Sequence, residues 1–244
     1  MDSMNQITSL QHPLVKHLVK LRTNRSYRTA EKKVLIVGEN LVKEIPLSTL
    51  LTVNEAPKEL KFEKHYIVTE AIMKKITGLE HPEGIAAEVY MPAEATFKSV
   101  KRLLILDGVN DPGNMGTLIR TALALGWEGV YITSNSCDPF NDKALRAAKG
   151  ATFRLPLAFG DWDDLKSLLS RHQINPYAAD MGGSPIQEID KNQSIALIMG
   201  NEARGISSEA DQLCTKIAIP MSGKMESLNV AVAGGILMYC LENQ

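Results

Sequence analysis

The feature that most constrains this chain is a repeated alternation of short apolar segments and amphipathic segments in its second half. Strands are expected at 103–106, 129–133, 152–156, 176–180, 195–200 and 216–220; helices are expected at 114–125, 143–149, 162–172 and from 229 onward. Such alternation predicts a mostly parallel sheet with helices on both faces. Ligands of these sheets bind beyond the carboxyl ends of the strands, so a ligand site is expected among the loops at that edge.

The chain has 244 residues, which is long enough for two domains that each bury a core. The boundary is expected within residues 91–100, where Pro92 interrupts regular structure before a new apolar strand. We therefore expect an N-terminal domain over residues 1–95 and a C-terminal domain over residues 96–244. The first domain shows a helix near 13–22, strands at 34–38, 65–69 and 84–90 and a helix at 39–45, which predicts a small α/β fold.

Cysteine usage and the terminal segment suggest a cellular location. The three cysteines are widely spaced without a CxxC pair, which is typical of a reducing cytosol, and the five histidines show no zinc-binding spacing. No cationic-then-apolar leader opens the sequence, and the longest uncharged apolar stretch, near 230–240, is too short to span a bilayer. We expect a soluble cytoplasmic protein that needs no metal and no membrane.

Positive charge is concentrated at the start of the chain, although the formal net charge of the whole is −1. Residues 1–33 hold seven Lys/Arg and two acids, a local excess of five positive charges. A solvated helix face is the ordinary interpretation of such a segment. Phosphate contacts, with Tyr27 as a stacking group, are the interpretation preferred here. The candidate RNA-binding residues are Lys16, Lys20, Arg22, Arg25 and Arg28.

The first unusual loop, DGVNDPGNMGTLIRTA over residues 107–122, packs turn formers and polar groups between a strand and a helix. A helix cap by Asn114 explains one of these residues. Arg120 stands among apolar neighbours, and a buried arginine needs partners. An ion pair with Asp107 or Asp111 and a contact with an anion or RNA are comparable explanations for it.

The second unusual loop is MGNEARGIS over residues 199–207. Gly200 and Gly205 match the outer glycines of a phosphate loop, but Ile206-Ser207 replaces the Lys-Ser/Thr pair that nucleotide hydrolysis requires. No GxGxxG follows any strand, which argues against a dinucleotide site. The remaining interpretations are a Gly-flanked turn around a ligand and a surface pair between Glu202 and Arg204 of little energetic value.

The third loop, IPMSGKMESLNVAVA over residues 219–233, leads into an apolar final helix. Ser227 and Asn229 are typical N-terminal cap residues of such a helix. Ala231, Ala233, Gly234 and Gly235 allow another element to approach closely. A capped, buried helix accounts for these residues but leaves the long polar loop before it unexplained.

Taken together and in this order, the three loops resemble the motifs of the SpoU (TrmH) family of RNA ribose 2′-O-methyltransferases. DPGNMGTLIRTA resembles the first motif, IMGNEARGI the second and IPMSGKMESLNVAVA the third. The resemblance covers roughly residues 101–244. ITSLQHPLVKHLVKL, VLIVGENLVKEI and HPEGIAAEV are more loosely similar to the L30e-like substrate-binding domain of many members.

The resemblance implies a SPOUT fold whose C-terminal segment forms a deep trefoil knot, S-adenosylmethionine as methyl donor, and a homodimer with sites near its interface. General chain topology alone argues against a knot. By resemblance, the catalytic positions are Asn114, Arg120, Glu202, Ser227 and Asn229, and the cofactor pocket is lined by Leu197, Met199, Gly200, Ile219, Met221 and Leu228.

The implied reaction needs alignment and stabilisation of charge on the ribose oxygen, since the methyl sulfonium is already activated. Arg120 suits this role as a fixed cation with several N–H donors, because a guanidinium stays protonated. Ribosomal RNA is favoured over tRNA as substrate. Two alternatives stand beside this hypothesis: an RNA-binding SPOUT relative without methyl transfer, and a small-molecule enzyme with a nucleotide cofactor.

Overall fold

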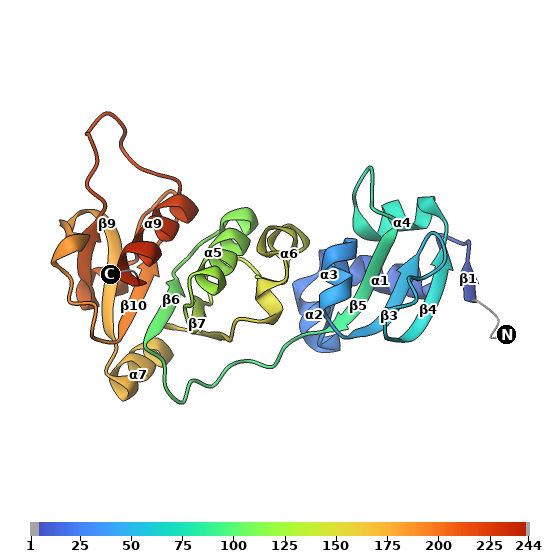
Figure 1. Ribbon diagram of the computed structural model, residues 1–244, viewed down its shortest axis with the longest axis horizontal. Helices are drawn as coiled ribbons and strands as arrows, with labels where there is room; N and C mark the ends of the chain where they lie inside the picture. The colour runs from blue at the N-terminus through green and yellow to red at the C-terminus, as the bar shows by residue number, and fades with distance from the viewer. Residues whose placement is uncertain (1–4, 243–244) are drawn as a thin grey trace. The chain divides into compact units, whose positions relative to one another are not determined.

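The computed structural model describes residues 5–242. The chain divides into two compact units (Figure 1). The first holds the residues up to Pro92 together with Phe140–Arg146, and the second holds Ala93–Pro139 and the residues from Ala147 onward. The short helix α6 (Asp142–Ala148) begins in one unit and ends in the other.

The first unit is built on a mixed five-stranded sheet with the strand order β1-β4-β3-β5-β2. The apolar residues of α1 and α4 recur at helical spacing, so each helix buries one face on this sheet, while Thr69 and Gly78 cap α4 at its two ends. Its elements are β1 (Asn5–Ile7), α1 (Pro13–Thr23), α2 (Arg25–Glu31), β2 (Lys33–Val37), α3 (Glu39–Glu44), β3 (Leu47–Thr52), β4 (Phe62–Val68), α4 (Glu70–Thr77) and β5 (Ile85–Tyr90).

The second unit is built on a six-stranded sheet with the order β11-β9-β10-β6-β7-β8, in which every neighbouring pair is parallel. The central strands β6 and β10 are buried along nearly their whole length, as expected for a sheet covered on both faces. Its elements are β6 (Arg102–Leu106), α5 (Pro112–Ala124), β7 (Gly129–Thr133), η1 (Ala151–Phe153), β8 (Leu157–Gly160), α7 (Trp162–His172), β9 (Asn175–Pro185), η2 (Ile186–Glu188), β10 (Ile195–Met199), α8 (Ser208–Leu213), β11 (Thr215–Ala218) and α9 (Val230–Glu242).

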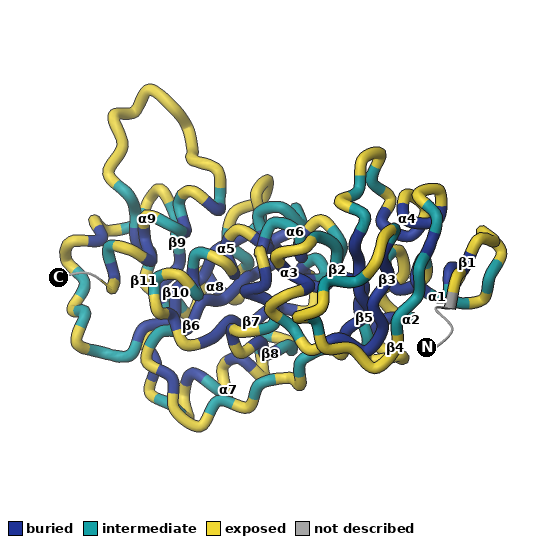
Figure 2. Tube along the Cα trace, turned by 45° about the vertical axis from the view of Figure 1, so that its right-hand side comes forward, coloured by how far each residue is buried: buried dark blue, intermediate teal, exposed yellow. Residues whose placement is uncertain are grey.

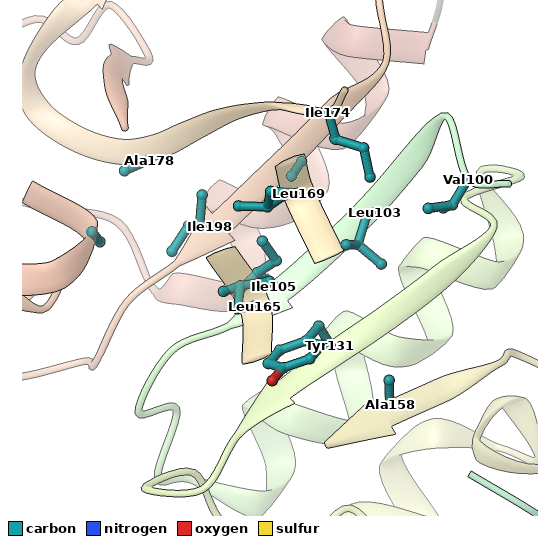
Figure 3. Close-up of a cluster of buried hydrophobic side chains, with 12 residues drawn as sticks. Val100, Leu103, Ile105, Tyr131, Ala158, Leu165, Leu169, Ile174, Ala178 and Ile198 are labelled. Carbon is teal, nitrogen blue, oxygen red and sulfur yellow. The ribbon is translucent and has the colours of Figure 1, made fainter. Parts of the chain in front are cut away.

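Side chains alternate along the strands and so build a core on each face of this sheet. On one face, Leu165 and Leu169 of α7 pack against Leu103 and Ile105 of β6 and against Ile198 of β10 (Figure 3). On the other face, α5 and α9 pack against each other and on the sheet. They approach closely because Gly234 has no side chain: a Cβ there would lie 2.4 Å from Leu118 Cδ2.

The predicted α/β fold with a parallel sheet is confirmed, whereas the strand predicted at 152–156 is wrong. Gly150, at φ 86°, ends the preceding turn, and the chain then forms the 3₁₀ helix η1. The N–H groups of Phe153 and Arg154 bond to carbonyls three residues earlier, so the strand begins only after Pro156. The residue patterns also gave no prediction for β1, α2, β3, α4, η2 and α8. Among residues 5–242, no helix is long and apolar enough to cross a membrane.

Candidate active site

The three unusual loops meet at the carboxyl edge of the parallel sheet. They follow β6, β10 and β11, and since parallel strands end at a common edge, their loops lie together. A cavity of about 610 Å³ opens there. The lining residues come from the middle of β9, from β10 with the loop that follows it, and from the segment between β11 and α9 with both of these elements. They are Ala179, Asp180, Met181, Met199, Gly200, Asn201, Glu202, Ala203, Gly205, Ile217, Ala218, Ile219, Met221, Ser227, Leu228, Asn229, Val230, Ala233 and Leu237.

Asn114 joins all three loops through its side-chain amide. Its Nδ2 donates to Glu202 Oε1 at 3.1 Å, and its Oδ1 accepts from Asn229 Nδ2 at 3.1 Å. Asn229 in turn accepts the N–H groups of Ala231 and Val232 and so caps α9. Asn114 is not the cap of α5, because Asp111 holds that position and accepts the Asn114 N–H at 2.9 Å. The three predicted residues therefore form one hydrogen-bonded chain.

Glu202 ties the second loop to the first. Its carboxylate accepts the main-chain N–H groups of Asn110 and Asp111 at 3.2 and 3.1 Å, in addition to the Asn114 amide. Partial burial raises the pKa of the Glu202 carboxyl, but these hydrogen bonds outweigh it and hold the pKa below its ordinary value. Glu202 is therefore an anion at neutral pH, and the surface pair with Arg204 considered above is not formed in the described structure.

The second loop is a tight turn that depends on Gly200. Asn201 and Gly205 exchange two main-chain hydrogen bonds at 2.8 and 2.9 Å. A Cβ on Gly200 would lie 2.5 Å from the Gly205 carbonyl oxygen, so no other residue fits without moving the backbone. Asn201 closes the turn by accepting two further N–H groups and donates to the Gly108 carbonyl at 2.7 Å. The turn thus carries Glu202 at a fixed position.

Asp107, which is 1% exposed, is a buried hydrogen-bond acceptor at the carboxyl edge of the sheet. Its carboxylate accepts Trp162 Nε1–H and the Ser207 N–H, both at 3.2 Å. It also adds to the effect of burial on Cys214, raising the pKa of that thiol to about 12. Asp107 therefore connects the first loop with the last residue of the second loop and with the start of α7, and it forms no ion pair with Arg120.

Arg120 lies on the exposed side of α5 rather than among the apolar residues beside it in sequence. Its guanidinium makes no hydrogen bond or ion pair with any residue between 5 and 242. It does not line the cavity, and it stands six residues along α5 from Asn114, about 9 Å farther along the helix axis. Of the two explanations left open for Arg120, the ion pair with Asp107 or Asp111 is not formed, and the exposed cation is available to a ligand.

The third loop forms an exposed arch between β11 and α9 (Figures 1 and 2). Residues 220–229 are all exposed, and Met225 is 71% exposed. Ser227 borders the cavity but makes no hydrogen bond in the described structure, so it is not the cap residue that the sequence suggests. Asn229 alone fills that role.

Five of the six residues expected to hold the cofactor line the cavity: Met199, Gly200, Ile219, Met221 and Leu228. Leu197 does not, because it is fully buried within β10 and, by strand alternation, faces away from the α7 cluster that holds Ile198. Asp180 was missed by the sequence analysis, although an acidic residue at the end of an expected strand is a signal for it. Of the described residues, those that line the cavity include two carboxylates, Asp180 and Glu202, and no lysine, arginine or histidine.

In the first unit, three of the five candidate RNA-binding residues are exposed: Lys16, Lys20 and Arg25. Lys20 Nζ lies 5.4 Å from the centroid of the Tyr27 ring, which is within cation–π range. Tyr27 is held in turn by a hydrogen bond of 2.8 Å to His17 Nδ1. An aromatic ring and positive charge are therefore presented together on α1 and α2.

The other two candidates have structural partners. Arg28 is 3% exposed, and its Nη1 donates to the carbonyls of Leu21 and Arg22 at 2.6 and 2.8 Å. Arg22 Nε donates to the Ile76 carbonyl at 2.9 Å. The assignment of Arg28 to RNA is therefore corrected: its guanidinium satisfies the last carbonyls of α1 and has no face left for a phosphate.

The chain is similar to known RNA methyltransferases. The model of the SpoU rRNA Methylase family matches residues 101–239. A Bacillus subtilis protein named 23S rRNA (guanosine(2553)-2′-O)-methyltransferase RlmP is 36% identical, with 98% of this chain and 99% of that protein covered. A Streptomyces viridochromogenes protein named 23S rRNA (uridine(2479)-2′-O)-methyltransferase is 26% identical, covering 88% and 84% of the two chains.

Among solved structures, an AdoMet-bound rRNA methyltransferase from Sinorhizobium meliloti superposes with a TM-score of 0.82 at 27% identity, covering 98% of this chain and 97% of the other. The fold and the site define a methyltransferase of the SpoU type. The chain belongs to the SpoU rRNA Methylase family.

Proposed function

We propose that this protein transfers a methyl group from S-adenosylmethionine to a ribose 2′-hydroxyl of ribosomal RNA. The observation that carries the proposal is the hydrogen-bonded chain of Glu202, Asn114 and Asn229, which joins the three family motifs beside one cavity. Family membership and the names of the full-length relatives support the reaction.

The cavity fits the cofactor by size and by charge. Its volume of about 610 Å³ lies within the range of small-molecule sites. Met199, Ile219 and Leu228 offer apolar wall, and Asp180 and Glu202 offer negative charge to a sulfonium cation. A wall with two carboxylates and no basic side chain is unfavourable for the phosphates of ATP or NAD, which argues against the small-molecule alternative. When bound, the cofactor supplies an electrophilic methyl group.

Arg120 is the proposed catalytic cation. Among the described residues, none that lines the cavity is a cation, so charge developing on the ribose oxygen needs one from outside the wall. Arg120 is exposed and has no partner within residues 5–242. Ser227, exposed at the cavity border, is proposed to orient the ribose. Asn114, Glu202 and Asn229 hold the loops in register, while the 2′-hydroxyl proton leaves to water or phosphate.

A homodimer is part of the proposal. Val232, Ile236 and Tyr239 are 51%, 38% and 58% exposed and follow the i, i+4, i+7 spacing of one helix face. This outer face of α9 is apolar, while its inner face packs on α5. Replacing Val232 and Ile236 with glutamate is expected to shift sedimentation from dimer to monomer.

For the chain as a whole, we propose an RNA-binding L30e-like domain over residues 1–95 and a SPOUT methyltransferase domain over 96–244 with a deep trefoil knot. Lys16, Lys20 and Arg25 beside Tyr27 support the first assignment. The second is supported by β10 lying between β9 and β6, with α9 packing on α5 after the arch. Replacing Lys16, Lys20 and Arg25 with glutamine is expected to raise the Michaelis constant for RNA.

The substrate class is tested by methyl transfer to RNA from a strain that lacks this gene. Purified protein and labelled S-adenosylmethionine are incubated with separated 23S rRNA, 16S rRNA and tRNA. We expect label in 23S rRNA, with the guanosine named for the Bacillus subtilis relative as the first position to map. Label confined to tRNA would contradict the ribosomal assignment. Bound cofactor without label in any RNA or in ribosomal particles would favour the binding-only alternative.

A further inference from the structure

The second unit has another cavity, of about 280 Å³, at the opposite edge of its parallel sheet. Its wall comes from three segments that meet where β6 and β10 begin and where α7 ends. Val100 closes its base and belongs to the core cluster of Figure 3, in which Val100 and Ile174 lie toward the start of β6. The wall is formed by Lys98, Ser99, Val100, Lys101, Arg171, His172, Gln173 and Ser194.

This cavity is basic and has no acidic residue in its wall. Lys98, Lys101, Arg171 and His172 all contribute to it. None of their side chains forms a hydrogen bond or ion pair with any residue in the described range 5–242. Glu128 approaches only through the Lys101 main chain, whose N–H it accepts at 2.7 Å, and it is not part of the wall.

The dipole of α7 accounts for only two of the four basic residues. Arg171 and His172 lie in the last turn of α7, where positive charge offsets the helix dipole. Lys98 and Lys101 belong to the segment before β6, where no helix dipole favours positive charge. Lys98, Lys101 and Arg171 carry charges of the same sign around one cavity, so an anionic ligand would reduce their mutual repulsion.

We propose that this cavity binds a backbone phosphate of the substrate RNA. Lysine offers a point charge and arginine a planar fork of donors to phosphate oxygens, and the Ser99 and Ser194 hydroxyls line the same wall. The inference rests on the proposed function, because it takes the substrate to be RNA.

The cavity lies apart from the site of methyl transfer, because the five residues of β6 separate the two edges of the sheet by about 13 Å of strand. The bound phosphate therefore belongs to a different nucleotide from the methylated one.

The test compares two double variants that each remove two positive charges from the second unit. Lys98→Gln with Arg171→Gln alters the cavity, and Lys166→Gln with Lys191→Gln is the matched control outside its wall. The probe is a fluorescein-labelled 23S rRNA transcript, followed by anisotropy at several salt concentrations. Thermal unfolding and S-adenosylmethionine binding check that each variant is folded.

For the cavity variant we expect a Kd for the transcript roughly three- to tenfold higher than that of the control. Its plot of log K against log salt should flatten by about 1 to 2 units, since two phosphate contacts are lost. The methyl-transfer rate at saturating RNA should stay unchanged.

Equal Kd values and equal salt slopes for the two double variants would overturn the inference while leaving the proposed function intact. Failure of the wild-type protein to bind the transcript would instead overturn the proposed function and the inference together. A third outcome is tested by titrating the protein with inorganic phosphate while the His172 ring signals are followed by NMR. A phosphate-dependent shift with unchanged RNA affinity would assign the cavity to a small phosphate ligand and overturn the RNA assignment.

Discussion

The two edges of the parallel sheet in the second unit differ in their charge and in how far their side chains are hydrogen-bonded to one another. The carboxyl edge holds a cavity with two carboxylates and no basic side chain, between loops joined by Asn114. The amino edge holds a smaller cavity with four basic groups, no acid and no hydrogen bond between their side chains. The two cavities of one sheet thus differ in the sign of their charge, which is the basis for proposing a methyl sulfonium in the first and an RNA phosphate in the second.

The largest loss of methyl-transfer rate is expected on replacing Arg120, the proposed catalytic cation outside the wall of the carboxyl-edge cavity. Arg120→Ala should lower the rate of methyl transfer at least about a hundredfold, because a single donor to developing charge contributes that much. The Arg120 side chain is exposed and has no partner in the part of the chain that the structure describes, so the thermal unfolding temperature should not change. Single-turnover kinetics measures the effect, with Arg204→Ala as a control on the neighbouring loop. Retention of more than a few per cent of the rate would remove Arg120 from the chemistry.

A smaller loss of methyl-transfer rate is expected when the hydrogen bonds between the three loops are removed. Asn114→Ala removes both bonds that join the three loops, and misplacement of reacting groups by about 1 Å lowers rates up to a hundredfold. We expect a ten- to hundredfold lower rate and about 1 kcal/mol less stability. Asn114→Asp keeps the bond from Asn229 but places a carboxylate against Glu202. Wild-type rates in Asn114→Ala would show that the chain of bonds is not needed.

The charge of the carboxyl-edge cavity is tested at Asp180. Asp180→Asn should weaken S-adenosylmethionine binding roughly three- to tenfold, because one of two carboxylates facing a cation is lost in a partly solvated site. Calorimetry with S-adenosylhomocysteine, which lacks the positive charge, is the control and should show a smaller change. An equal change for both ligands would mean that Asp180 acts by packing rather than by charge.

The smallest effect is expected from pH. Hydrogen bonds hold the Glu202 pKa below its ordinary value of 4.5, so Glu202 stabilises the folded loops above that value. The stabilisation should be lost only as the pH falls through the lowered pKa. Between pH 5 and 8, the Glu202→Gln variant and the wild type should therefore differ in stability by a constant amount, measured by urea unfolding. A difference that changes within this range would contradict the assignment.

The carboxyl-edge site could be predicted from sequence because parallel strands fix where their loops end. Glu202 and Asn229 are far apart in the chain, yet both follow the carboxyl ends of strands in the same sheet. Leu197 fails for a related reason: strand alternation puts it within the core, and only the residues at the end of β10 reach the cavity. Family motifs thus identify a segment but not the direction of each side chain.

The basic residues were harder to assign, because their role depends on packing rather than on composition. Arg25 and Arg28 lie three residues apart on α2, yet one is exposed and the other bonds to the carbonyls of α1. The amino-edge cavity could not be predicted at all. Lys98 and Arg171 are brought together only when β6 and α7 pack, and no spacing in the sequence records that contact.

The most direct test of the account is the chemical position of the transferred methyl group. After reaction of the wild-type protein with labelled S-adenosylmethionine and 23S rRNA, the RNA is digested to nucleosides and resolved by mass spectrometry. The account predicts label on the ribose of a single 2′-O-methylnucleoside, absent when Arg120→Ala replaces the wild type. Label on a base, or equal ribose label with Arg120→Ala, would contradict it.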